Sequence, residues 1–333
     1  MKIVVFELED WEQDTFRKLE KDHEIIFAER KTGGKLAENY TDADALSPFI
    51  YTNLSAGYLK QFSNLKLIAT RSTGFDHIDR DYCKENGITI CNVPVYAEET
   101  VAEHVFALIL AISHKITEAV RRTREGNFSQ DGLEGFDLKG KTMGVIGTGN
   151  IGFNVIEIAR GFNMNVIAFD IRPDDEVASR LGFSYVSMDE LLEKADVISL
   201  HVPGNEKTRN LISRNEFSRM KPEAVLINTS RGFIVDIEAL LEALVNNRIR
   251  AAGLDVLPEE PTIREEAELL RSIFAERHNL DTLFAGHMLA HRSNVLVTPH
   301  SAFNTREAKQ RLLDTTIDNI IAFAGGRPQN VVE

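Results

Sequence analysis

The chain has 333 residues, a length that predicts two domains, and its 43 % hydrophobic content is enough to form ordinary cores. A net charge of −13 argues against nucleic-acid and anionic-membrane partners, because both are bound through clustered positive charge. The two cysteines, Cys83 and Cys91, have no metal-ligand spacing, and no apolar run is long enough for a secretion signal or a membrane span. We therefore expect a soluble, cytoplasmic protein without a bound metal.

The first hundred residues alternate short apolar runs with polar segments of helical pattern. Strands are expected at residues 3–6, 24–28, 45–51, 67–70 and 88–91, and helices at 11–20, 55–61 and 80–85. Because strands that alternate with helices form parallel sheets covered on both faces, this part of the chain predicts a small α/β unit.

One long helix is predicted next, because the sequence from Glu98 contains no proline or glycine until Gly126. Its middle is apolar on nearly every side, so it should be buried. Burial within the same chain and burial against a second copy both fit this pattern, and the second alternative predicts a homodimer.

A second α/β unit is predicted from Thr142 onward. Strands are expected at residues 142–146, 165–170, 197–201, 224–228, 251–256 and 295–298, and helices at 151–161, 188–194, 214–219, 237–246 and 305–324. The charged segment 262–292 is predicted to be a loop with some helix.

A glycine motif follows the first of these strands, in the run TMGVIGTGNIG. Gly147 permits a tight turn, Gly149 lets the backbone approach a pyrophosphate, and Gly152 lets the next helix pack close to the sheet. The following strand ends in Asp170, 18 residues after Gly152, as a dinucleotide-binding unit requires. The Asp170 carboxylate would bind ribose hydroxyls and repel a 2′-phosphate, which favours NAD over NADP, although Arg172 could soften this preference.

Charged residues follow three later strands of the same unit. Arg231 comes just after the strand predicted at 224–228, acidic residues follow the strand at 251–256, and His300 follows the strand at 295–298. Each of them alone also fits a surface or packing residue. Ligands of α/β sheets bind at the carboxyl ends of strands, so the set predicts a carboxylate-binding cation beside an acid–base pair.

In order, the motifs GTGNIG, NTSRG, GLDVLPEEP and TPHSAF resemble the D-isomer-specific 2-hydroxyacid dehydrogenases, and the resemblance covers essentially the whole chain. Within that family the chain is most similar to the NAD-dependent D-lactate dehydrogenases, through RSTGFDHID, NVPVYAEETVAEH, NFSQD and the insert before NVLVTPHSAF. The resemblance implies two doubly wound parallel-sheet α/β domains with a cleft between them. A discontinuous, flavodoxin-like substrate-binding domain would comprise residues 1–98 and 300–333, and a Rossmann NAD-binding domain residues 99–299.

The resemblance also implies catalytic roles. Arg231 would bind the substrate carboxylate and polarise the keto oxygen, His300 would be the acid–base group, and Glu260 would hydrogen-bond His300. The chain departs from the family at Leu257-Pro258, where an aromatic residue and an acid are usual, and Glu259 and Glu260 are adjacent. We favour Glu260 as the catalytic acid because the following Pro261 also matches.

The remaining site residues are carried over in the same way. Substrate would contact the backbone N–H groups of Thr73 and Gly74 and the walls formed by Tyr96 and Phe303, with Tyr51 as a further wall. NAD would contact Gly147, Gly149, Asn150, Ile151, Gly152, Asp170, Val202, Pro203, Thr208, Thr229, Ser230 and Asp255.

The implied reaction is the reversible reduction of a 2-oxo acid, pyruvate in the first place, to the D-2-hydroxy acid. Glyoxylate, hydroxypyruvate and branched or aromatic 2-oxo acids are alternatives, whereas formate is disfavoured because that branch pairs its histidine with an amide. An alternative of another class is an NAD(H)-sensing regulator of the same fold, as in the C-terminal-binding-protein corepressors. Such a regulator would lack ordinary turnover.

Overall fold

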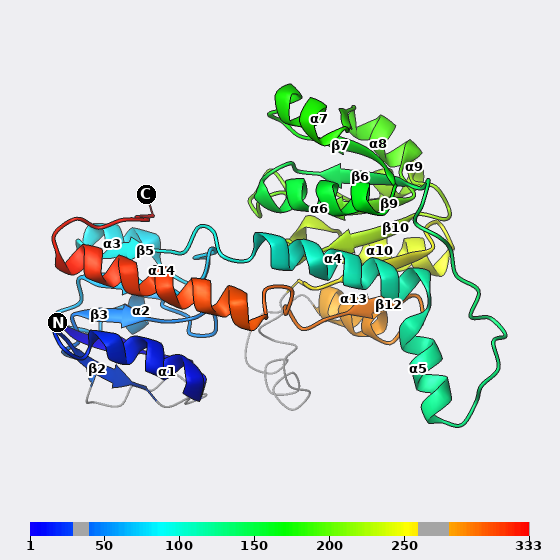
Figure 1. The fold of residues 1–333 in the computed structure, drawn as a ribbon. Coiled ribbons are helices and arrows are strands. Elements are labelled where there is room, and N and C mark those ends of the chain that lie inside the picture. The colour runs from blue at the N-terminus through cyan, green and yellow to red at the C-terminus, as the bar shows by residue number, and fades with distance from the viewer. Residues whose placement is uncertain (29–39, 259–279, 333) are drawn as a thin grey trace. The chain divides into compact units, whose positions relative to one another are not determined.

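The chain forms two compact units in a computed structural model that describes residues 1–28, 40–258 and 280–332 (Figure 1). Unit 1 comprises Met1–Ala97 and Asn304–Glu333, and unit 2 comprises Glu98–Phe303. The second crossing between the units therefore lies after Phe303, whereas the sequence placed it before His300. The reason is that the backbone N–H groups of Ser301 and Ala302 donate to the carboxylate of Asp255 in unit 2.

Unit 1 is built on a five-stranded parallel sheet. Its strands are β1 (Lys2–Val5), β2 (Glu24–Phe27), β3 (Ala45–Ser47), β4 (Leu67–Ala69) and β5 (Thr89–Cys91), in the order β2-β1-β3-β4-β5. This is the flavodoxin-like order. The strand predicted at 45–51 was too long: β3 ends at Ser47, and the next residue, Pro48, has no N–H for the strand ladder.

Helices cover both faces of this sheet, as the sequence predicted. On one face are α1 (Asp10–Phe16), the 3-10 turn η1 (Arg17–Leu19) and α14 (Arg306–Ala324), and on the other are α2 (Ala56–Leu59) and α3 (Arg80–Glu85). Alternate strand residues serve the two cores, since Ile3 and Val5 pack with α1 and α14 whereas Val4 packs with α2 and α3. The C-terminal helix thus returns to complete the first unit.

Unit 2 is built on a seven-stranded parallel sheet. Its strands are β6 (Thr142–Ile146), β7 (Asn165–Phe169), β8 (Ser184–Tyr185), β9 (Val197–Leu200), β10 (Val225–Asn228), β11 (Ala251–Leu254) and β12 (Val295–Val297). The order β12-β11-β10-β9-β6-β7-β8 is the Rossmann order with one more strand. The chain direction across the sheet reverses between β6 and β9, which is where such folds bind ligands.

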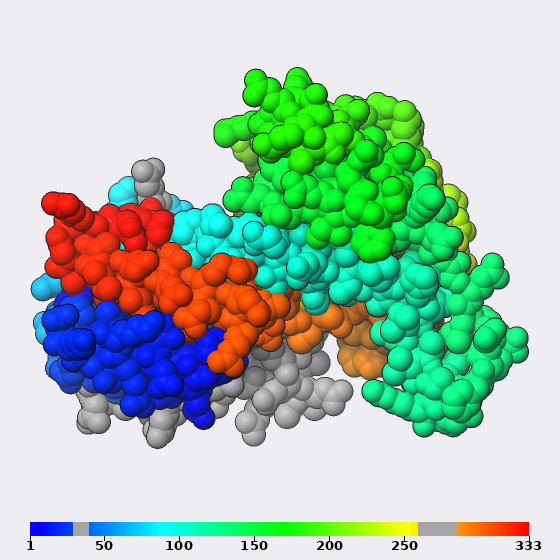
Figure 2. Space-filling model, in the orientation of Figure 1, coloured from blue at the N-terminus to red at the C-terminus, as the bar shows by residue number. Residues whose placement is uncertain are grey.

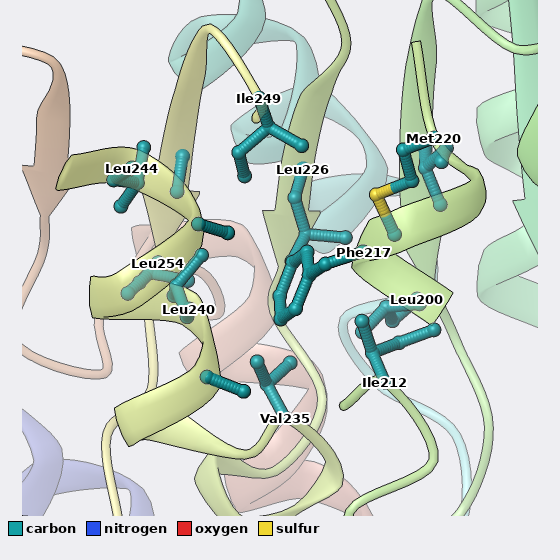
Figure 3. Packing of buried hydrophobic residues seen from close by; sticks show 14 of the residues in the cluster. Leu200, Ile212, Phe217, Met220, Leu226, Val235, Leu240, Leu244, Ile249 and Leu254 are labelled. Carbon is teal, nitrogen blue, oxygen red and sulfur yellow. The ribbon is translucent and has the colours of Figure 1, made fainter. Parts of the chain in front are cut away.

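The two faces of this sheet carry separate hydrophobic cores. Helices α8 (Met188–Lys194), α9 (Arg214–Arg219), α10 (Ile237–Val245) and α13 (Leu280–Ala290) cover one face, and α4 (Glu98–Ser113), α6 (Asn150–Gly161) and α7 (Asp175–Leu181) cover the other. Figure 3 shows the first core, in which Phe217 of α9 and Leu240 of α10 lie against Leu226 of β10. All three side chains are almost completely buried, so this packing fixes the strands whose ends carry the polar site residues.

The long helix predicted from Glu98 is two helices, α4 and α5 (Ile116–Arg124), bent by 61° at their junction. The break has a non-local cause: the Ser113 carbonyl accepts a hydrogen bond from the backbone N–H of Phe136, and Lys115 adopts a left-handed φ of 51°. Apolar residues of α4 such as Val105 and Ile109 are buried against α6 and the sheet, so burial within the chain is correct for this helix.

No single helix among the described residues is long and apolar enough to cross a membrane, although α4 and α5 taken together pass the same test of length and composition.

Candidate active site

The glycine motif lies at the point where the strand order of unit 2 reverses, between the end of β6 and the start of α6. Gly147 has a φ of 94°, and a Cβ there would lie 2.7 Å from the carbonyl carbon of His201. A Cβ on Gly152 would lie 2.2 Å from the carbonyl oxygen of Gly147. Gly149 faces open space, and Asn150 starts the helix, whose free N–H groups favour an anion. The turn therefore needs Gly147 and Gly152, and the open space at Gly149 leaves room for a pyrophosphate.

Asp170 follows β7 beside this turn. Its Oδ2 accepts hydrogen bonds from the backbone N–H (2.7 Å) and the hydroxyl (3.1 Å) of Thr148, and its Oδ1 accepts one from the N–H of Arg172 (2.8 Å). Partial burial alone would raise the pKa of Asp170, but these hydrogen bonds outweigh it and hold the pKa below its usual range. The carboxylate is therefore ionised at neutral pH, as the ribose role requires.

The next turns of the sheet edge supply polar groups as well. Thr208 donates its hydroxyl hydrogen bond to the carbonyl of Pro203 (2.7 Å) and so closes the turn after Val202. Ser230 donates to the carbonyl of Leu200 (2.7 Å). The hydroxyl oxygen of Thr229 is buried and has no hydrogen-bond partner within the described part of the chain. An orphaned hydroxyl, an ionised carboxylate and an open glycine turn fit an NAD molecule along this edge.

Arg231 follows β10 at the same edge and is half-buried. Its Nη1 donates to the carbonyl of Ser230 (2.9 Å), and the side chain of Asn228 donates to the Arg231 carbonyl (3.0 Å). A Cβ on Gly204 would lie 2.6 Å from Cγ of Arg231, so the arginine stem depends on a glycine beside it. The local structure thus orients a partly accessible guanidinium.

His300 follows β12 in a tight loop with a left-handed φ of 51°. Its backbone N–H donates to the carbonyl of Asp255 (2.9 Å) and to that of Thr298 (2.9 Å). The half-buried imidazole lies edge-on to the ring of Phe303, with 6.2 Å between ring centroids. Asp255, a predicted NAD contact, is 1 % exposed and its carboxylate holds the loop after His300.

Three of the predicted site residues therefore follow three neighbouring strands of one sheet: Arg231 after β10, Asp255 after β11 and His300 after β12. Glu260 lies outside the described residues, so its role stays a prediction.

Thr73, Gly74 and Tyr96 belong to unit 1. The Thr73 hydroxyl donates to the carbonyl of Val93 (2.7 Å), and the side chain of Arg311 donates to the carbonyl of Tyr96 (2.7 Å). Both loops are thereby fixed within their unit. Tyr51, the further wall, is 43 % exposed.

The sequence did not single out two histidines near these residues. His201 follows β9, where its Nε2 lies 2.8 Å from the hydroxyl of Ser199 and its Nδ1 has no partner among the described residues. Burial lowers the pKa of His201 to about 3. His104 of α4 lies with its Nε2 3.1 Å from the hydroxyl of Thr298. His104 could have been noticed in the sequence, because it is a histidine inside a largely apolar helix.

Comparisons with known proteins identify the family of the chain. Residues 106–302 match the sequence model of the family described as D-isomer specific 2-hydroxyacid dehydrogenase, NAD binding domain. The D-lactate dehydrogenase of Escherichia coli (strain K12) is 34 % identical over 326 residues, 96 % of each chain. A glyoxylate reductase of Thermococcus litoralis is 34 % identical over 343 residues, covering 100 % of this chain and 97 % of the relative.

Solved structures give the same result over the whole chain. A crystal structure of D-lactate dehydrogenase from Aquifex aeolicus, complexed with NAD and lactic acid, has a TM-score of 0.84 and 35 % sequence identity, covering 97 % of this chain and 96 % of that one. The two relatives and this neighbour are all named as enzymes, which favours an enzyme over the regulatory alternative. The chain therefore belongs to the D-isomer-specific 2-hydroxyacid dehydrogenase family, as an enzyme that uses NAD.

Proposed function

We propose that this dehydrogenase reduces a small 2-oxo acid, pyruvate in the first place, to the D-2-hydroxy acid, and that the reaction is reversible. The observation that carries the proposal is the succession of Arg231, Asp255 and His300 after β10, β11 and β12, at the sheet edge that also bears the glycine turn. A fixed cation, a buried carboxylate and an imidazole suit a substrate with a carboxylate beside a carbonyl.

Each of these side chains has a distinct chemical task. Bound NADH supplies the hydride that the carbonyl carbon receives. The planar fork of Arg231 would bind the substrate carboxylate and polarise the keto oxygen. His300 would donate its proton to that oxygen during reduction and accept it during oxidation. Glu260 would hydrogen-bond the imidazole and favour its protonated form.

We further propose that unit 1 contributes the substrate-binding domain, through the backbone N–H groups of Thr73 and Gly74 and through Tyr96. Phe303 would form another wall, and its ring already lies beside the imidazole of His300. Aromatic walls favour a small or apolar substituent on the 2-oxo acid, so a methyl group suits the site. Glyoxylate is the second candidate, because the Thermococcus litoralis relative that matches the whole chain is a glyoxylate reductase.

A panel of 2-oxo acids tests these assignments. We expect kcat/KM to be highest for pyruvate, lower for glyoxylate and hydroxypyruvate, and lowest for phenylpyruvate, with NADH preferred over NADPH because of the ionised Asp170. Chiral chromatography of the product should give the D isomer. A higher kcat/KM for glyoxylate would select the second candidate, and a preference for phenylpyruvate would contradict both.

We also propose that the protein works in the cytoplasm, where Cys83 and Cys91 stay as buried free thiols. We propose further that it forms a homodimer through α5. Ile116 and Val120 lie one helical turn apart on α5, are 49 % and 41 % exposed, and form an apolar strip. Figure 2 shows α5 and the following chain standing out from the rest of unit 2 as a lobe. Light scattering should give twice the mass of one chain, and Val120→Glu should halve it.

A further inference from the structure

The loop that carries His300 rests on one buried carboxylate. Asp255 is 1 % exposed, and its Oδ1 accepts hydrogen bonds from the hydroxyl of Thr298 (2.5 Å) and the backbone N–H of Ser301 (2.9 Å). Its Oδ2 accepts one from the N–H of Ala302 (2.8 Å), and its main-chain carbonyl accepts the N–H of His300 (2.9 Å). Three successive residues of the loop are thus held by Asp255.

His300 needs such support because its backbone is in the left-handed region, with a φ of 51°. This conformation costs energy for a residue with a side chain, so contacts from the surrounding structure help to stabilise it. The orientation of the imidazole therefore depends on how firmly the Asp255 carboxylate is itself fixed.

Hydrogen counting shows what fixes the carboxylate. The Thr298 hydroxyl has a single hydrogen, and this hydrogen is used in the bond to Oδ1 of Asp255. The Nε2 of His104 lies 3.1 Å from the Thr298 hydroxyl oxygen and 3.5 Å from Oδ1 of Asp255. Both oxygens act as acceptors towards it, so Nε2 must carry a hydrogen and be the donor.

We propose that His104 is a positioning residue for the catalytic histidine: from α4, its Nε2–H fixes the Thr298 hydroxyl, and through it the Asp255 carboxylate that holds the His300 loop. The inference rests on the proposed function, since it takes His300 as the acid–base group. His104 is 150 or more residues away in sequence from the other members, so it links the first helix of unit 2 to the reactive end of its last strand.

The direct test compares His104→Leu, which removes the donor, with His104→Gln, whose amide can still donate. We expect His104→Leu to lower kcat for pyruvate reduction about 5- to 20-fold, the usual effect of one lost hydrogen bond in a network, with KM for NADH changed less than about 2-fold. His104→Gln should recover most of that kcat. His114→Gln, at an exposed histidine just beyond α4, is the matched control and should turn over like the wild type.

A double-mutant cycle with Thr298→Val sharpens the test, because both changes remove the same link. The double variant should be no slower than about the slower single variant, whereas independent effects would multiply. Thr298→Ser keeps the hydroxyl and should remain close to wild type. If His104→Leu does not fold, the difference in kcat between Thr298→Val and Thr298→Ser still tests the link through this hydroxyl.

The outcomes separate the two proposals. If His300→Ala is strongly impaired but His104→Leu keeps the wild-type kcat, or His104→Gln is as slow as His104→Leu, the role of His104 is wrong and the proposed function stands. If His300→Ala turns over at the wild-type rate, both proposals are overturned.

Discussion

The carboxyl edges of the two sheets each place an arginine just after a strand, and the two arginines differ in what they contact. Arg71, after β4 of unit 1, is 2 % exposed. Its guanidinium donates to the carbonyls of Phe6 (2.6 Å), Glu7 (3.1 Å) and Ser47 (3.0 Å), which follow or end β1 and β3. Burial lowers the pKa of Arg71 to about 10, although the nearby carboxylates of Glu12 and Glu7 act in the opposite direction, so the group stays charged at neutral pH.

Arg231, after β10 of unit 2, is half-buried and bonds the carbonyl of its own neighbour, Ser230. The two positions look alike in the sequence. They differ because strand ends that converge around Arg71 present carbonyls that need donors, whereas Gly204 leaves room beside the stem of Arg231. The guanidinium of Arg71 thus serves three main-chain carbonyls of its own unit, whereas we expect that of Arg231 to bind the substrate carboxylate.

The same substitution at both positions would test this contrast, and the larger effect is expected at Arg231. Arg231→Met should lower kcat/KM for the preferred 2-oxo acid by about 10²–10³-fold, equivalent to ~3–4 kcal/mol, because the carboxylate and the polarised oxygen lose their cation. The melting temperature should stay within about 2 °C of the wild type. Steady-state kinetics and thermal unfolding measure the two effects, and a stability loss without a kinetic effect would reverse the comparison.

Arg71→Met should do the opposite. We expect the free energy of unfolding of unit 1 to fall by about 3 kcal/mol, because buried carbonyls and acids lose their partner. The only tryptophan of the chain, Trp11, lies in α1 of this unit, so its fluorescence in urea reports the loss. Arg17→Met is the matched control: this side chain is 57 % exposed and pairs with an exposed acid, so less than about 0.5 kcal/mol should be lost. Equal losses in both variants would show that Arg71 is not a structural cation.

Local pattern was enough to predict much of this molecule. The apolar runs that became β6, β7, β9, β10, β11 and β12 were predicted within two residues at each end, because buried parallel strands are apolar throughout. The glycine turn with Asp170 and the charged residues after β10 and β12 could also be predicted, because each of them follows a strand closely. The fold class and the family follow from these signals, and both are confirmed.

What the sequence did not predict depends on partners far along the chain. The break between α4 and α5 is set by Phe136, and the structural role of Arg71 is set by carbonyls about 24 and 65 residues away. The link from His104 to Thr298 spans 194 residues. Short polar elements were missed as well: α7 and the two-residue β8 have too little periodicity to be recognised.

Two histidines that follow strands of unit 2, His201 and His300, also differ in their surroundings, and the effect on stability expected from His201 is smaller than that expected from Arg71. His201 follows β9 and His300 follows β12, but burial lowers the pKa of His201 to about 3, whereas a histidine in an unfolded chain titrates near 6.5. Between these values the unfolded chain binds a proton that the folded chain does not bind, so His201 destabilises the fold progressively as the pH falls below 6.5. His201→Phe should therefore make stability decrease less steeply with falling pH, by at most ~1.4 kcal/mol per pH unit. Urea unfolding of both proteins followed by circular dichroism between pH 7 and pH 4.5 measures the slopes. Parallel slopes would mean that the pKa of His201 is the same in the folded and unfolded chains, and the effect assigned to its burial would then be wrong.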